Sequence, residues 1–158
     1  MASADQLRGP LLTWLDLGGL IAQPGASREP SGLNVIGYRG AGFIGRVRLV
    51  EIEAASDVAA VEGALEYLRA ARGRAHALYL ACTPAAAAGY LQAQAAAPRA
   101  QRWKPETLRE RLQQAGLGLL VVEGDAVAQA MPPVEQTPTQ ARLAELAAAE
   151  PPRKTVRW

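Results

Sequence analysis

Hydrophobic and polar residues follow each other along this chain with two different periods, one typical of strands and the other of helices. Residues 33–39 and 43–54 are rich in branched side chains, and in the second segment Val47 and Leu49 alternate with arginines. Such period-two alternation is typical of a strand that has one face in the core. Between residues 57 and 71 the hydrophobic residues instead recur every three or four positions, which indicates a helix.

The same reasoning predicts the remaining elements. Helices are expected over residues 10–22, 84–97, 105–116 and 137–150, and strands over residues 75–83, 117–123 and 126–131. Pro10 suits the first turn of its helix, and Thr137 begins a capping box. This order of elements predicts an α/β fold in which a mixed central sheet is flanked by helices.

The chain has 158 residues, of which 49% are hydrophobic and 20% are charged. These values are ordinary for a folded protein with one domain, which we expect over residues 1–150. Residues 151–158 are basic and begin with proline, so we expect a flexible tail there. No secretory signal is visible, and the longest apolar stretch is too short to span a bilayer. The sequence therefore predicts a cytoplasmic protein with no membrane partner.

A single cysteine, Cys82, and a single histidine, His76, exclude a disulfide framework, an iron–sulfur cluster and an ordinary zinc site. Both residues fall in the predicted strand 75–83, which favours core positions over a catalytic pair. Arginine outnumbers lysine fifteen to two, so chemistry that requires lysine has to use Lys104 or Lys154. The net charge of +2 is too small to indicate nucleic-acid binding by itself.

The segment from Gly40 to Gly45 matches the pattern G-x-G-x-x-G directly after a predicted strand. In dinucleotide-binding folds these glycines allow a tight turn and a close approach of the pyrophosphate. That motif requires a helix that begins directly after the glycines, whereas the composition of residues 46–54 favours a strand. We therefore favour a hairpin turn that makes the strands 33–39 and 43–54 antiparallel, with the second strand central. A nucleotide-binding module is the lesser alternative.

Glu51 and Glu53 occupy alternate positions of a predicted strand, so their side chains point to one face, with Cα atoms about 6.5–7 Å apart. Two carboxylates on an apolar face are costly to bury unless a cation or hydrogen-bond donors meet them. One interpretation is a solvated strand end. The other is a site for Mg²⁺ or Mn²⁺, which prefer carboxylate and carbonyl oxygens.

The segments LNVIGYR (33–39) and RLVEIEA (48–54) resemble the PD-(D/E)XK nuclease superfamily, which has the restriction-endonuclease-like fold. The family pattern places an aspartate at the start of one strand and Glu-x-Lys near the end of the next, after a hairpin. The resemblance covers residues 10–135, including the predicted helix 57–71 and the strand 75–81. It implies a restriction-endonuclease-like core.

By this resemblance Asn34 stands where the family has its metal-binding aspartate, Glu51 where it has its second acid, and Glu53 where it has its lysine. Only Glu51 matches the pattern. A glutamate at the lysine position reverses the charge that would offset developing negative charge on phosphate. Asp16, on the first helix, could supply a further carboxylate. Tyr67 is similar to a tyrosine that some members place near the site, although its spacing favours packing.

These two departures favour a non-catalytic module of nuclease fold that binds or scaffolds a protein or nucleic-acid partner and needs no cofactor. The alternative is a DNA nuclease that depends on Mg²⁺ or Mn²⁺, with Glu51 and Glu53 as its catalytic residues. The metal would then be held by Asn34, Glu51, Glu53 and Asp16.

Three arginines are the candidates for contact with DNA phosphates or with a partner protein: Arg39, Arg46 and Arg48. By strand alternation, Arg46 and Arg48 lie on the face opposite the glutamates. Arg39 lies near the same end of the sheet. Aromatic residues make up only 5% of the chain, so no stacking platform for single strands is expected. The oligomeric state stays open, with a homodimer among the options.

Overall fold

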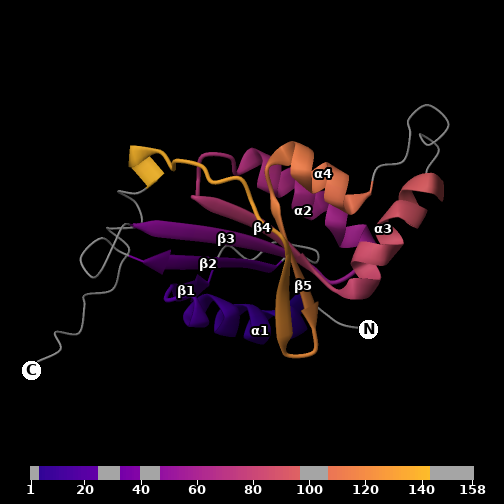
Figure 1. The fold of residues 1–158 in the computed structure, drawn as a ribbon, viewed down its shortest axis with the longest axis horizontal. Coiled ribbons are helices and arrows are strands. Elements are labelled where there is room, and N and C mark those ends of the chain that lie inside the picture. The colour runs from indigo at the N-terminus through magenta and orange to yellow at the C-terminus, as the bar shows by residue number, and fades with distance from the viewer. Residues whose placement is uncertain (1–3, 25–32, 40–46, 97–106, 143–158) are drawn as a thin grey trace, which may run out of the picture.

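A six-stranded mixed sheet lies at the centre of the protein (Figure 1). The structure is a computed structural model, and it describes residues 4–24, 33–39, 47–96 and 107–142. The strands lie in the sheet in chain order: β1 (Ile21–Pro24), β2 (Leu33–Arg39), β3 (Arg48–Ala55), β4 (Ala77–Cys82), β5 (Gly118–Glu123) and β6 (Ala126–Met131). The three central strands β3, β4 and β5 are parallel, and the other neighbouring pairs are antiparallel.

Helices cover both faces of this sheet (Figure 1). One face carries α1 (Ala4–Leu17), and the other carries α2 (Val58–Ala70), α3 (Pro84–Ala96) and α4 (Leu108–Ala115). Each face has its own hydrophobic core, with Leu15 of α1 in one and Leu65 of α2 in the other. The predicted α/β fold with a mixed sheet flanked by helices is thus confirmed. None of the described helices is long and apolar enough to cross a membrane.

The predicted hairpin is confirmed where the structure describes it. β2 has the predicted bounds and pairs antiparallel with β3, which occupies a central place in the sheet. The glycine motif at residues 40–45 and Arg46 lie outside the described residues. A strand occupies residues 48–55, where a dinucleotide-binding motif would need a helix.

The first helix differs from the prediction. α1 begins at Ala4, so Pro10 lies inside the helix instead of in its first turn. The buried stripe begins with Leu7, one turn before the proline. The helix also ends earlier than predicted, because Gly19 adopts the left-handed region (φ 78°) and turns the chain. Ile21 therefore lies in β1 instead of on the helix.

Side-chain caps fix the starts of the later helices. The Asp57 carboxylate accepts the N–H of Ala60 at 2.9 Å at the start of α2, as predicted. Thr107 caps α4 in the same way, whereas the predicted start at Pro105 lies outside the described residues. At the last predicted helix the cap is Thr139 and not Thr137, because its hydroxyl accepts the N–H of Arg142 at 3.2 Å. Residues 143–158, including the predicted tail, lie outside the described residues.

Residues 132–139, here named the C-terminal strap, run back across one end of the sheet. Main-chain bonds tie the strap to three other segments: Val134 N–H to Gly116 C=O (3.1 Å), Gln136 N–H to His76 C=O (2.8 Å) and Thr139 N–H to Gly73 C=O (3.1 Å). The Gln136 side chain also accepts the N–H of Gly73 at 3.0 Å. The strap therefore closes the ends of α2, β4 and α4 with backbone hydrogen bonds.

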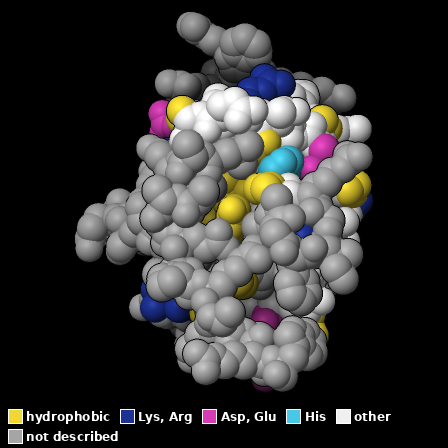
Figure 2. All heavy atoms as spheres, turned by 90° about the vertical axis from the view of Figure 1, so that its left-hand side faces the viewer, with side chains coloured by type: hydrophobic (Ala, Val, Ile, Leu, Met, Phe, Trp, Pro, Cys, Tyr) yellow, Lys and Arg dark blue, Asp and Glu magenta, His cyan; other side chains and the backbone are white. Residues whose placement is uncertain are grey.

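His76 lies at this end of the molecule, immediately before β4, and Figure 2 shows the histidine beside hydrophobic side chains. The ring nitrogen Nδ1 of His76 accepts the backbone N–H of Leu49 at 3.0 Å. The backbone N–H of His76 donates to the Leu49 carbonyl, also at 3.0 Å. Burial and the nearby Arg48 guanidinium lower the pKa of His76, and the Glu135 carboxylate opposes this shift. Cys82 is fully buried in β4 as predicted, and burial raises the pKa of its thiol to about 12.

We expect His76 to make the stability of the protein depend on pH below about 7. The pKa of His76 is lower in the folded chain than its ordinary value of about 6.5. The unfolded chain therefore binds the proton first, so the stabilisation is complete above about pH 6.5 and is lost as the pH falls through the folded pKa. Urea unfolding at a series of pH values measures this loss, which is at most about 1.4 kcal/mol per pH unit.

The matched variant for this experiment is His76→Asn, whose amide oxygen can still accept the Leu49 N–H but does not titrate. The free energy of unfolding of the natural protein, minus that of the variant, should decrease as the pH falls from 7.5 to 5.5. A difference that stays constant over this range would contradict the prediction.

Candidate functional site

Asn34, Glu51 and Glu53 project from two neighbouring strands to the same face of the sheet. In the antiparallel register of β2 and β3, Asn34 lies opposite Glu53 and Glu51 lies opposite Ile36. Strand alternation places the two glutamates on the same side as Leu49, which belongs to the core under α2. The three candidate residues therefore meet on the face that α2 covers. We name them the carboxylate cluster.

The carboxylate cluster is buried and hydrogen-bonded. The exposed fractions of Asn34, Glu51 and Glu53 are 4%, 1% and 2%. Asn34 Nδ2 donates to Glu53 Oε2 at 3.0 Å, and the Tyr67 hydroxyl donates to Glu51 Oε1 at 3.1 Å. Tyr67 thus packs against the core and also contacts the cluster directly. Burial and the Glu51 carboxylate raise the pKa of Tyr67, so its hydroxyl stays a proton donor.

The oxygens of the carboxylate cluster partly suit a metal ion. Asn34 Oδ1 and Glu51 Oε2 are buried and have no hydrogen-bond partner, and amide and carboxylate oxygens are ligands of Mg²⁺. In the described part of the chain, however, no three His, Cys, Asp or Glu side chains are grouped to hold a metal. The donor atoms fit a hard cation, but their burial puts them out of reach of a nucleic-acid phosphate in this conformation.

Asp16 lies elsewhere. It is exposed on α1, which packs on the face of the sheet opposite the carboxylate cluster. This position corrects the expectation that a helix carboxylate joins the other ligands. The reason is topological, because the chain order alone does not decide which face of the sheet the first helix covers.

Two of the three candidate arginines lie on the α1 face. Arg39 and Arg48 are directly opposite each other in the β2–β3 register. Both terminal nitrogens of Arg48 donate to the carboxylate of Glu135 in the C-terminal strap, at 2.9 and 2.8 Å, and this contact raises the pKa of Arg48. The Nε of Arg39 is buried and has no hydrogen-bond partner. Arg46 lies outside the described residues.

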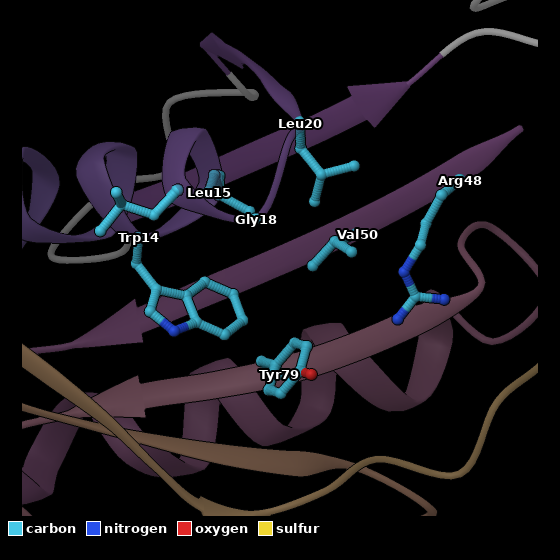
Figure 3. A pocket seen from close by; sticks show the side chains of 8 residues that line it. Trp14, Leu15, Gly18, Leu20, Arg48, Val50 and Tyr79 are labelled. Atoms are coloured by element: carbon cyan, nitrogen blue, oxygen red, sulfur yellow. The ribbon is translucent and has the colours of Figure 1, made fainter. Parts of the chain in front are cut away.

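A pocket of about 350 Å³ opens beside Arg48 on this face, and the sequence did not predict it (Figure 3). Trp14 of α1 and Tyr79 of β4 lie edge to face in its lining, with ring centroids 5.4 Å apart. The Tyr79 hydroxyl donates to Gln129 of β6 at 2.9 Å. The lining comes from α1, β3 and β4 and the turn after α1, so no local motif in the sequence could have revealed the pocket.

Comparisons with known proteins bear on the fold. No protein-family model matches the chain, and no curated protein matches it. A solved structure of a protein of unknown function from Silicibacter pomeroyi is similar, with a TM-score of 0.58 and 14% sequence identity. The match covers 94% of this chain and 83% of that one. At this level of identity the similarity shows a common fold, the α/β arrangement with a mixed sheet described above.

Proposed function

We propose that this chain is a restriction-endonuclease-like module that binds a partner protein and does not cleave nucleic acid. The hydrogen bond of 3.0 Å between Asn34 and Glu53 carries the proposal. By the resemblance, this bond joins the two positions at which the family has its metal-binding aspartate and its lysine. At these two positions in the family the first strand carries the acid and the second carries the hydrogen-bond donor. Here the donor, Asn34, lies on β2, and the acid, Glu53, lies on β3. The two side chains can still form a hydrogen bond, but the arrangement that cleavage needs is lost.

The chemistry of phosphodiester hydrolysis supports this proposal. Cleavage requires a held metal, an activated water and positive charge near the phosphate. In the carboxylate cluster the aspartate position holds a neutral amide, and the lysine position holds an anion. Tyr67, which donates to Glu51, is a neutral phenol and supplies no positive charge either. We therefore assign no catalytic role to the cluster, whose hydrogen bonds link β2 to β3 and α2 to β3.

Surface composition favours a protein as the partner. Leu17, at the end of α1, and Ile21, in β1, have exposed fractions of 82% and 60%. The two residues are four positions apart in the chain, on either side of the turn after α1, and exposed apolar patches are typical of protein interfaces.

A metal-dependent nuclease is the second candidate function. The two buried oxygens without donors, Asn34 Oδ1 and Glu51 Oε2, are the observation that favours it. If the cluster moved to admit a cation, Asn34, Glu51 and Glu53 would be its ligands.

Incubation of the purified protein with supercoiled plasmid and Mg²⁺ or Mn²⁺ tests the proposal. We expect no nicking or linearisation, and no calorimetric heat of Mn²⁺ binding that depends on Glu51. The matched control is Glu51→Gln, which keeps the acceptor for Tyr67 but removes the charge. Cleavage that disappears in this variant would contradict the proposal and support the nuclease.

A further inference from the structure

The pocket beside Arg48 has the features of a binding site for a small molecule. Its volume of about 350 Å³ lies in the range of small-ligand sites. Leu15, Leu20, Val50 and Tyr79 in its lining are all buried, so its walls belong to the core between α1 and the sheet. Trp14 and Tyr79 add aromatic surface, which favours a flat apolar ligand.

One end of the pocket is positively charged. Figure 3 shows Arg48 at this end and Trp14 at the other, with the Tyr79 hydroxyl directed toward the arginine side. Arg39 lies opposite Arg48 on the same face, and like charges in this position destabilise a sheet unless an anion lies near them. Among the residues that the structure describes, Glu135 pairs with Arg48, and no carboxylate pairs with Arg39. The exposed Asp16 is not part of the lining.

The existing ion pair indicates which anion this end accepts. A guanidinium binds a carboxylate through two parallel N–H donors, and Arg48 binds Glu135 in this way. These two bonds use two of the five N–H donors of Arg48. Arg39 lies opposite Arg48 in the register and adds positive charge nearby, although it is not part of the lining. A second carboxylate would satisfy donors that the protein leaves unused.

We infer that this pocket binds a small organic carboxylate with a flat apolar body. The body lies between Trp14 and Val50, and the carboxylate accepts hydrogen bonds from Arg48, the arginine in the lining. The pocket lies on the opposite face of the sheet from the carboxylate cluster, so this binding is independent of the proposed loss of cleavage.

Calorimetric titration with naphthalene-2-carboxylate tests the inference, because this probe combines a flat apolar body with one carboxylate. We expect saturable binding to one site, with a dissociation constant on the order of 0.1–1 mM for a ligand of this size. The uncharged naphthalene-2-carboxamide should bind roughly fivefold or more weakly, because it lacks the charge-assisted hydrogen bonds.

Substitutions at the charged end and at the rim locate the site. Arg48→Met should remove most of the preference for the acid over the amide, and Arg39→Met, which changes a charge outside the lining, should reduce it less. The matched control is Arg72→Met, which changes an exposed arginine outside the lining and should leave binding unchanged. Leu17 lines the pocket and is exposed, so Leu17→Asp and Leu17→Lys change the charge at the rim without disturbing the core. Leu17→Asp should weaken binding of the acid, and Leu17→Lys should strengthen it.

Three results would overturn the inference. The first is the absence of saturable binding by the acid at concentrations up to about 10 mM. The second is equal affinity for the acid and the amide. The third is an effect of Arg72→Met as large as that of Arg48→Met, together with no response to the charge at position 17, which would indicate unspecific attraction.

Discussion

Replacing Glu51 with methionine is expected to stabilise the protein by about 1–3 kcal/mol, which is the typical cost of leaving a buried polar group without a hydrogen-bond partner. Glu51 is 1% exposed, and one of its carboxylate oxygens has no hydrogen-bond donor. The free energy lost when such a group is buried is larger than the stabilisation from its one hydrogen bond, which comes from Tyr67. For a domain of this size the melting temperature should rise by roughly 3–10 °C.

Thermal unfolding followed by circular dichroism, in buffer with a chelator, measures this change. The matched control is Glu66→Met, an exposed glutamate on α2, which should change the stability by no more than about 0.5 kcal/mol. A lower melting temperature of Glu51→Met would contradict the prediction. If Mn²⁺ then stabilised the natural protein but not Glu51→Met, the result would also favour the metal-dependent alternative over the proposed function.

The substitution Gly118→Val is expected to have a large effect in the opposite direction. A Cβ atom at this position in β5 would lie 2.7 Å from two ring atoms of Tyr79 and 3.0 Å from Pro133 of the C-terminal strap. Neither neighbour moves easily, because Tyr79 is buried against Trp14 and the strap is fixed by its own backbone bonds. We expect a loss of about 3 kcal/mol, which is a typical cost of overpacking a core.

Denaturant unfolding monitored by fluorescence gives this value directly. Gly63→Ala in α2 serves as the control, because no atom lies within 4 Å of the added Cβ and alanine is the better helix former. That variant should be more stable than the natural protein by up to about 1 kcal/mol. Equal stability of Gly118→Val and the natural protein would show that the Tyr79 ring can move aside.

Local signals in the sequence were sufficient for much of the fold. The segment 33–39 forms a strand with the predicted bounds, because alternation and flanking glycines both mark it. Asp57 and Gly116 end up at the helix termini that their capping preferences predict. The predicted start of α1 at Pro10 is wrong, because the helical spacing of buried residues continues before the proline to Leu7.

The candidate site depended on information that a single sequence does not contain. The shared face of Glu51 and Glu53 follows from alternation alone, but their burial depends on what packs above them. The hydrogen bond from Tyr67 requires the rotation of α2 over β3, and the location of Asp16 requires the choice of face for α1. The pair Gly18 and Gly19 is a local signal in the sequence for the early end of α1.

The C-terminal strap has a consequence for the order of folding. It joins residue 136 to residue 76 and residue 139 to residue 73, which are contacts of large sequence separation. Closing such long loops is slow, so these bonds form late. During synthesis the N-terminal part of a chain emerges first. A nascent chain therefore carries its sheet with one end still open, and the carbonyl groups of Gly73 and His76 remain solvated, until residues 132–139 have left the ribosome.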